Sequence, residues 1–353
     1  MSMRGFIGSA VVATFMMAGC GTGQVDQGDG TAEANLLKYR CPDPSTDCTA
    51  SNGVGVYTEE DGYAGMGAEH FMITHFINQS GGGVTLVARY FNSATGLWEF
   101  TTGSVYYANF EGLQHLTVLS VKETNTVVSW ALFDPGTNTY YTATDSELLK
   151  LQVVISLGKL YTLDWDDATT ETMKATVHKY NMRWRFTGSS TATQYCLRAD
   201  SSKDEVVFQG GMAVNPTTAA VTRSSTTDAF VTMSCRYGGI ATVRLWGYPY
   251  RTPYNTYFFD AGLQMKRASY CADSSYYTKA NTKIRIWDAA GVNQDPMSAA
   301  EVEAWWTPTG ATCIGPMRHS GMGFSGKCNG VPLPPCSGVS GGKLADAASP
   351  PAF

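Results

Sequence analysis

Nine cysteines constrain the fold of this chain more than any other feature of its sequence. The first, Cys20, follows an apolar stretch near the N-terminus, and the other eight form an even set. An even set in an exported chain is typical of a disulfide framework. No two cysteines have the C-x-x-C spacing of a zinc ribbon or a thioredoxin-like motif. We therefore predict four disulfides among the eight. The eight are Cys41, Cys48, Cys196, Cys235, Cys271, Cys313, Cys328 and Cys336.

Two of these disulfides are expected to close short loops. Prolines lie between Cys41 and Cys48, and also between Cys328 and Cys336. Because proline bends the chain, we expect each of these two pairs to form a local bridge. The remaining four cysteines allow three connectivities, among which the sequence does not choose. Each disulfide that spans a long loop should stabilise the fold by ~2–4 kcal/mol, mainly by restricting the unfolded chain.

The first 20 residues have the pattern of a bacterial lipoprotein signal peptide. A short basic segment ends at Arg4, the apolar run GFIGSAVVATFMMA follows, and small residues precede Cys20. The run matches the core of a signal peptide and is short for a membrane span. A lipidated Cys20 would hold the protein on a membrane, because two or more acyl chains anchor stably. We therefore expect a protein of the bacterial cell envelope, lipid-anchored to the outer membrane or the cell surface.

Charge and composition argue against nucleic acid as a partner. The net charge is −5 and no run of Lys and Arg stands out. Charged residues make up 16% of the chain, below the ~25% of ordinary soluble domains. Thr, Ser, Asn and Tyr must supply the polar surface instead, and these types favour strands and turns over helices.

Changes in composition and residue pattern divide the chain into five segments. Residues 1–20 are the signal peptide, 21–52 a polar tether, 53–180 a β-rich domain, 181–320 a second domain and 321–353 a tail rich in Pro and Gly. The tail is too rich in Pro, Gly, Ala and Ser to be expected as a packed element. We predict a mainly β or α+β fold. It combines an N-terminal antiparallel domain, sandwich or barrel-like, with a disulfide-stapled β-rich domain carrying two short helices.

Individual elements follow from local patterns. The stretches GVTLVARYFNSATGLWEF and VVSWALFDPGTNTYYTAT each predict a hairpin, because turn formers separate β-branched and aromatic runs. In KIRIW, Ile284 and Ile286 should face one way along a strand. The segment FVTMSCRYGGIATVRLWGY is a further strand candidate. One helix is expected from about Asp260, as an N-cap, to Cys271, and a second from SAAEVEAWW, where Ser298 and Glu301 have capping-box spacing.

The segment KRASYCADSSYYTKANTKIRIWD resembles the signature of the ADYC-domain family of myxobacterial and related bacterial proteins. That signature reads R-A-D-Y-C, a turn, then T-x-I and an acidic residue. The pieces WRFTGSSTATQYC, SCRYGGIATVRLWGY and VEAWWTPTGATC match in the same order, so the resemblance covers about residues 181–320. It implies no known activity. The chain departs from the pattern at Ser269, where the family has aspartate, and at Thr242-Val243, where it has Lys-Cys. The signature positions here are Arg267, Ala268, Ser269, Tyr270 and Cys271.

Cys271 is a nucleophile, a metal ligand or half of a disulfide. A nucleophile needs a nearby base and a lowered pKa. Arg267, one helical turn earlier, would favour a thiolate, and His319 is the only histidine after residue 180. The even cysteine set of an exported chain favours a disulfide over either alternative. Ser269 also lacks the carboxylate that would act as an acid or base, so we expect no catalytic residue.

The segment WGYPYRTPYNTYFF is the best candidate for a binding loop. Two prolines, Pro249 and Pro253, stiffen it, and aromatic planes on a rigid loop suit a carbohydrate or a peptide. The alternative is that the rings pack over the core, and buried tyrosines in small disulfide-rich domains favour that alternative. The tyrosines concerned are Tyr248, Tyr250, Tyr254 and Tyr257.

Other matches to known sites are weak. GVSGG, around Ser340, has the spacing of a nucleophile elbow, but no histidine follows it in the chain. GMGFSGKC nearly matches a phosphate loop, but Cys328 replaces the hydroxyl that would hold magnesium. We therefore assign neither an acyl-transfer site nor a nucleotide site.

The sequence predicts no cofactor and no metal site. His70 and His75 lie five positions apart, an odd spacing, and would therefore face opposite sides of a strand. Asp164, Asp166 and Asp167 lack the ligand order and the glycine of an EF-hand, so a solvated turn is the favoured interpretation. Together these observations favour a non-catalytic binding or scaffold protein. The alternative is an exported hydrolase whose site lies near Cys271 and His319.

Overall fold

The computed structural model describes most of the chain from residue 55 to residue 348. The described residues are 55–58, 71–92, 94–95, 97–197, 203–215, 218–224, 229–250, 255–271, 273, 275–279, 282–319, 321–339 and 341–348. The predicted signal peptide with Cys20, the tether and the expected Cys41–Cys48 disulfide lie outside them. So do His70, Tyr254 and Ser340.

Eight antiparallel strands close into a ring. Going around it, each strand pairs with the next in the order β1, β2, β3, β7, β8, β9, β13 and β16, and β16 pairs back to β1. Closure removes the unpaired edges that an open sheet would leave. The strands are β1 (Phe71–Asn78), β2 (Val84–Asn92), β3 (Leu97–Phe110), β7 (Leu151–Ser156), β8 (Leu160–Thr172), β9 (Thr176–Phe186), β13 (Val206–Gly210) and β16 (Phe230–Cys235).

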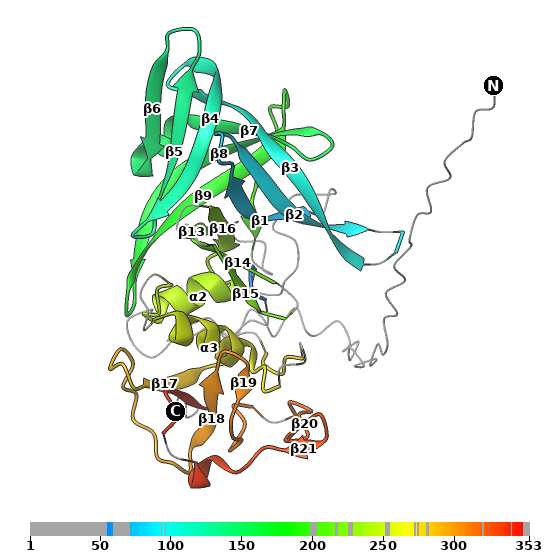
Figure 1. Ribbon diagram of the computed structural model, residues 1–353, viewed down its shortest axis with the longest axis vertical. Coiled ribbons are helices and arrows are strands. Elements are labelled where there is room, and N and C mark those ends of the chain that lie inside the picture. Colours follow the sequence, from blue (N-terminus) through cyan, green and yellow to red (C-terminus); the bar gives the residue numbers. More distant parts are fainter. Residues whose placement is uncertain are drawn as a thin grey trace, which may run out of the picture.

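Three more strands continue the sheet from β3 and fold over the ring (Figure 1). They are β4 (Leu113–Thr124), β5 (Val127–Asp134) and β6 (Thr139–Thr144). Trp130 of β5 is fully buried and makes edge-on ring contacts with Phe76 of β1 at 5.3 Å and Trp165 of β8 at 6.1 Å. The ring and its extension therefore share one apolar core.

Both predicted hairpins are present. β2 ends at Asn92 and β3 begins at Leu97. Between β5 and β6, the Asp134 carboxylate accepts hydrogen bonds from the Gly136 amide and the Thr137 hydroxyl, both at 2.8 Å. Aspartate is common at this position because its side chain mimics a backbone turn.

Short elements complete the part around the ring. They are the 3-10 helix η2 (Asp145–Lys150) and the strands β10 (Thr193–Gln194), β11 (Cys196–Leu197), β12 (Lys203–Asp204), β14 (Met212–Val214) and β15 (Val221–Arg223).

The C-terminal part is a second, smaller layer. Figure 1 shows helices α2 (Gly239–Leu245) and α3 (Asn255–Arg267) between the large sheet and a small four-stranded one. The small sheet has the order β17, β22, β18, β19. Its strands are β17 (Ile284–Asp288), β18 (Val302–Thr307), β19 (Gly310–Ala311) and β22 (Leu344–Ala348), and the remaining pieces are β20 (Lys327–Cys328), β21 (Val331–Pro332) and the 3-10 helix η3 (Cys336–Gly338). As predicted, Ile284 and Ile286 face the core together.

The described part of the C-terminal tail contains a packed strand, which contradicts the prediction from its composition. β22 pairs with β17 on one side and β18 on the other, so it is a central strand of the small sheet. Residues 344–347 are buried. Only five residues form this strand, and three of them are alanine. Five residues are too few for a periodic apolar pattern to stand out in the sequence. The strand is buried because it lies between β17 and β18.

Both helix predictions need correction. The first helix, α3, runs from Asn255 to Arg267, so Asp260 lies within it and pairs with Arg223 instead of capping it. At the second, Ser298 donates its backbone and hydroxyl hydrogens to the Glu301 carboxylate, each at 2.8 Å. That contact closes a turn, after which the chain enters β18. Valine and two tryptophans in this stretch favour the extended form, which pairs with β22.

Helix α2 was expected to be part of a strand. β16 ends at Cys235, and the helix begins at Gly239 with Gly238 as its N-cap. A side chain at Gly238 would collide with the carbonyl group of Tyr57. The two glycines therefore permit a close approach that a strand-like reading of GGIATVRL does not reveal.

The structure does not divide at residue 180. That position lies within β9, which pairs with β8 before it in the chain and with β13 after it. The expected boundary between a β-rich domain and a second domain therefore falls inside one strand of the ring.

Candidate functional site

The family signature begins at the C-terminal end of α3, where the helix stops in a well-formed cap. The Gln264 carbonyl accepts the Ser269 amide at 2.9 Å, and the Met265 carbonyl accepts the Ala268 amide at 3.1 Å. Ala268 has φ of 51°, the left-handed conformation that usually belongs to glycine at this position. The cap turns the chain sharply and directs Tyr270 and Cys271 into the protein interior, where both are buried.

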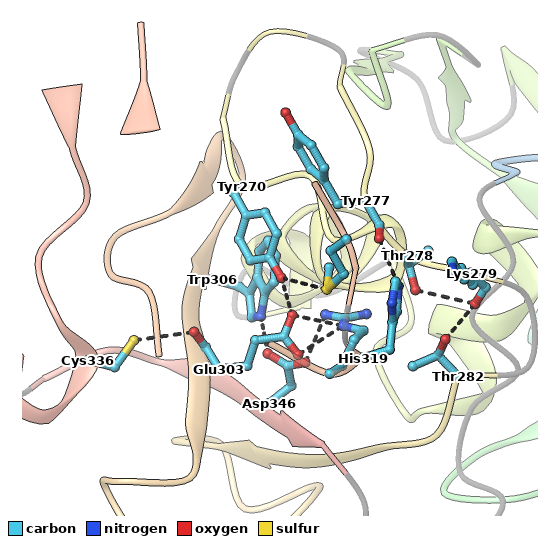
Figure 2. Close-up of polar contacts among 12 residues, drawn as sticks. Tyr270, Tyr277, Thr278, Lys279, Thr282, Glu303, Trp306, His319, Cys336 and Asp346 are labelled. Carbon is cyan, nitrogen blue, oxygen red and sulfur yellow. Dashed lines mark hydrogen bonds and ion pairs between the residues drawn. The ribbon is translucent and has the colours of Figure 1, made fainter. Parts of the chain in front are cut away.

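Tyr270 is held by rings and by a carboxylate. Its ring stacks on Phe324 with 4.5 Å between centroids and on Trp306 with 5.3 Å. Its hydroxyl donates to Glu303, and Figure 2 shows it pointing toward that carboxylate. Burial and the adjacent Glu303 raise the pKa of Tyr270 above its usual range. The tyrosine therefore remains a neutral donor at ordinary pH.

Beneath Tyr270 lies a fully buried ion cluster. Arg318 Nε lies 2.9 Å and 3.0 Å from the two Glu303 oxygens, and another Arg318 nitrogen lies 2.8 Å from Asp346. The Trp306 indole N–H donates to Asp346 at 2.6 Å. The ion-paired side chains have no exposed surface. Burial and the neighbouring Glu303 raise the pKa of Asp346 well above its usual value. This arrangement joins β18, β22 and the Arg318 segment.

The sequence did not point to Glu303, Arg318 or Asp346. Glu303 stood in a predicted helix, and Asp346 stood in the tail expected to be unpacked. No motif links the three positions, which come together only when β22 enters the sheet between β17 and β18.

The sulfur of Cys271 is bonded to Cys328. Disulfides also join Cys196 to Cys235 and Cys313 to Cys336. The structural role favoured for Cys271 thus agrees with the structure, but the predicted local pair Cys328–Cys336 is wrong. Within this stretch the chain turns back at residues 329–330, where β20 pairs with β21, and the Leu333 amide donates to the Gly326 carbonyl. The following residues run beside Ile314, which donates its amide to the Pro334 carbonyl and accepts the Cys336 amide. Cys336 is thereby placed next to Cys313 and not next to Cys328.

The other signature residues hold the turn after Cys271. The Arg267 carbonyl accepts the amides of Tyr277 and Thr278 at 3.1 Å and 3.2 Å. The Ser269 hydroxyl donates to the Ser275 carbonyl at 2.6 Å. An ionised aspartate, which the family has at this position, accepts hydrogen bonds but cannot donate this one. Ser269 therefore stabilises the backbone of the turn after Cys271.

His319 contacts the same turn. Its Nε2 lies 3.1 Å from the carbonyl oxygen of Tyr277, on the side of the cluster away from Glu303 in Figure 2. With Cys271 oxidised to Cys328, the two residues of the hydrolase alternative do not form a thiolate–imidazole pair.

The tyrosines of the predicted loop pack inward. Tyr248 is fully buried, stacks on Phe258, donates its hydroxyl hydrogen to Asp288 at 2.8 Å and accepts from Asn293 at 3.0 Å. Burial and Asp288 raise its pKa. Tyr250 is buried as well, and the Tyr257 hydroxyl donates to a backbone carbonyl. The packing interpretation of this segment therefore holds for these three residues.

The aspartate cluster on β8 is part of an ion-pair row. Asp164 and Asp166 both pair with Arg183, at 3.2 Å and 2.5 Å, and Asp164 also lies 3.0 Å from Arg185. Burial raises the pKa of Asp164, an effect that both arginines oppose. These residues lie within a strand and not in the solvated turn that was expected. Throughout the described ranges, no group of three or more potential metal-ligating side chains comes together.

A cleft lies on the outer surface of the ring, on β3, β7, β8 and β9. It consists of two adjoining hollows of about 360 Å³ and about 430 Å³. Asn109, Gln152 and Arg185 line both hollows. No motif in the sequence pointed to this cleft, because its residues are brought together by the pairing of β3 with β7 and by the register of β7, β8 and β9.

These features define a β-rich, disulfide-stapled protein whose signature residues build a buried turn. The model of the ADYC domain matches residues 137–320, just over half of the chain, and the chain belongs to this family. The match starts in the turn between β5 and β6, well before the position expected from the sequence, and includes β7, β8 and β9 of the ring. No curated protein and no solved structure matches the chain. Within the described residues, no helix has the length and apolar character needed to cross a membrane.

Proposed function

We propose that this chain is a lipid-anchored protein of the bacterial cell envelope that acts as a binding or scaffold module and not as an enzyme. One observation carries the proposal: the most reactive side chain of the family signature, Cys271, is joined to Cys328. A nucleophilic cysteine needs a free thiolate. The hydroxyl of the neighbouring Tyr270 is not available for catalysis either, since it is hydrogen-bonded to Glu303 inside the core.

Export is supported by the three disulfides. Cys196–Cys235, Cys271–Cys328 and Cys313–Cys336 all have the distances of formed bonds. Such bonds persist in oxidising compartments and are rare in a reducing cytosol. Together with the leader that ends at Cys20, they favour the outer membrane or the cell surface as the place where the protein works.

The anchoring claim is tested by fractionation of cells that make Cys20→Ser. We expect the wild-type chain in the membrane fraction with incorporated radioactive palmitate. Cys20→Ser should lose the label and become soluble or stay unprocessed. Ser9→Ala, in the same leader, is the matched control and should remain lipidated. Unchanged membrane partitioning of Cys20→Ser would show that the anchor is not a lipid on this cysteine.

The claim that the chain is not a hydrolase is tested by labelling thiols in the native protein. Iodoacetamide without reductant, followed by peptide mass spectrometry, should leave Cys271 unmodified, whereas reduction in urea should expose it. A native Cys271 that reacts would support the alternative hydrolase with His319.

A further inference from the structure

The outer cleft lies over two polar rows that run across the ring. In the first row, Asn109 of β3 is paired with Gln152 of β7, Gln152 with Asp164 of β8, and Asp164 with Arg183 of β9. β3 and the three consecutive strands β7, β8 and β9 thus place amide, amide, carboxylate and guanidinium groups side by side on one face.

The second row lies two residues along the same strands. Tyr107 is paired with Val154, Val154 with Thr162, and Thr162 with Arg185. Since side chains two residues apart share a face, both rows line the cleft. The residues between the rows point the other way, and Val153, for example, is fully buried in the main core. The cleft is therefore on the outside of the ring.

The cleft has the size of a small-molecule site. Its hollows, of about 360 Å³ and about 430 Å³, fall within the ~300–1,000 Å³ of typical ligand pockets. Residues 112–114 and 149–150 border one hollow, and residues 187–190 border the other. A sheet forms the floor, so the floor is held rigidly by the strand ladder, and the borders come from the start of β4, the end of η2 and the segment after β9.

The charges in the cleft are balanced. Arg183 is paired with Asp164 and Asp166, Arg185 with Asp164, and Lys150 with Glu111 at 2.6 Å. A site for phosphate or carboxylate would instead carry an excess of positive charge. The paired charges therefore favour an uncharged polar ligand.

Two side-chain amides in the floor of the cleft have N–H donors without a hydrogen-bond partner among the described residues. The side chain of Gln152 makes no hydrogen bond with any residue that the structure describes. Asn109 uses its side-chain oxygen to accept the His115 amide at 3.1 Å, which leaves its NH₂ group without a described partner. Tyr107 stands beside them, with its ring 4.5 Å from that of His115. Polar groups in a hollow are expected to be satisfied by a partner, either water or a ligand.

We propose that the outer cleft, defined by Tyr107, Asn109, Gln152, Thr162 and Arg185, binds a neutral saccharide. Amide groups offer both donors and acceptors, which suits hydroxyl groups that also do both. The Tyr107 ring supplies a flat apolar surface for one face of a sugar ring. This inference rests on the proposed function as a binding module, and it places the binding face on the ring rather than on the segment around Tyr248.

The test is calorimetric titration of the full chain, purified in detergent, with neutral trisaccharides. The probes are cellotriose, maltotriose and N,N′,N″-triacetylchitotriose, with citrate and inorganic phosphate as anionic probes. We expect at least one neutral trisaccharide to bind with a dissociation constant below a few millimolar, and the anions not to bind. Absence of binding by all three trisaccharides, or preference for an anion, would overturn the proposal.

Variants localise the site. Gln152→Ala removes a side chain that makes no described hydrogen bond, so it should leave the melting temperature unchanged and weaken sugar binding at least tenfold. Gln79→Ala, in the β1–β2 hairpin outside the cleft, is its control. Tyr107→Ala should also weaken binding, and Tyr140→Ala, an exposed tyrosine on β6, should not. Equal affinity in Gln152→Ala and Gln79→Ala would place the sugar elsewhere and overturn the assignment.

Failure of the saccharide-binding proposal can be distinguished from failure of the proposed non-catalytic function. Chromatography of the sugar after the titration shows whether it has been cleaved. A bound sugar that is recovered intact supports both proposals, whereas cleavage would keep the site and contradict the non-catalytic role. Lipid anchoring is read independently from the Cys20→Ser fractionation.

Discussion

Arg318 joins two carboxylates that would otherwise repel each other inside the protein. Glu303 and Asp346 lie on adjacent strands and have no exposed surface. Taking such charges out of water is costly unless each is paired and hydrogen-bonded. Tyr270 and Trp306 donate to the two carboxylates as well. Each side chain of the cluster is thus a hydrogen-bond or ion-pair partner of another. Arg318 is the single cation of the cluster, so the cluster is sensitive to its loss.

Replacing Arg318 by methionine should therefore be strongly destabilising. Arg318→Met keeps the length of the side chain and leaves two buried carboxylates uncompensated, and such a change typically costs about 3–5 kcal/mol. Urea denaturation measures the loss. Adding Asp346→Asn should recover part of it, because one of the unpaired charges is then removed. Lys150→Met is the control: its pair with Glu111 is exposed, and the unfolding free energy should hardly change. A loss for Arg318→Met no larger than that of the control would contradict the structural role of the cluster.

His75 gives the protein a predictable response to acid. Burial lowers its pKa from 6.5 to about 4. As the pH falls below 6.5, the unfolded chain takes up this proton before the folded protein does. The unfolding free energy should therefore fall between pH 6.5 and about 4, with about 2–3 kcal/mol arising from His75.

The variant His75→Phe isolates that contribution. It keeps a ring beside Phe230, which His75 contacts edge-on at 5.7 Å, and it cannot bind the proton. Urea denaturation at pH 7 and at pH 4.5 should show a smaller acid-induced loss of stability in His75→Phe than in wild type. Equal losses in both proteins would mean that His75 is protonated with an ordinary pKa.

At the scale of elements, the small C-terminal sheet depends on segments that reach it from two directions. β22 enters between β17 and β18 from the end of the chain, and β20 brings Cys328 to the signature turn. Neither segment has an apolar pattern of its own. β22 is held by backbone pairing on both sides and by the Asp346 contacts. β20 is held by the Cys271–Cys328 disulfide and by its pairing with β21.

The two disulfides of this layer should differ in their effect. Cys271–Cys328 spans 57 residues and Cys313–Cys336 spans 23. The loop-entropy relation then gives stabilisation of about 4 kcal/mol for the first and about 3 kcal/mol for the second. The double variants Cys271→Ser/Cys328→Ser and Cys313→Ser/Cys336→Ser serve as each other's control in urea denaturation.

The pairing itself is checked by peptide mapping of the unreduced protein. We expect one crosslinked peptide that contains Cys271 and Cys328, and another that contains Cys313 and Cys336. A peptide that links Cys328 to Cys336 would refute the observed connectivity.

For the molecule as a whole, the family match and the folding unit are different segments. The match covers residues 137–320, whereas the ring also needs β1, β2 and β3, and the small sheet needs β22. Without β1, β2 and β3 the ring has two open edges, at β7 and at β16. Without β22, the small sheet loses its central strand and Arg318 loses Asp346.

We therefore predict that residues 137–320 expressed alone do not fold. The fragment should show no cooperative thermal transition and should bind a dye for exposed apolar surface. Residues 55–348, exported to an oxidising compartment, are the control and should melt cooperatively. A 137–320 fragment that melts as sharply as the control would show that the family segment is an independent domain.

The β-rich class, both hairpins, the inward alternation of Ile284 and Ile286 and the family could all be predicted from the amino-acid sequence. These features depend on neighbours a few residues apart, so a local pattern carries them. The even cysteine set likewise predicted that disulfides join distant parts of the chain.

The pairing of the cysteines, the position of β22 and the meeting of Glu303, Arg318 and Asp346 could not be predicted and became visible in the folded chain. Each of these depends on segments far apart in the chain that share one buried interface, and the free energy of such an interface belongs to the pair of segments rather than to either sequence. The same reason explains the outer cleft: Asn109, Gln152 and Arg185 become neighbours only because the strand ladder of the ring sets them in register.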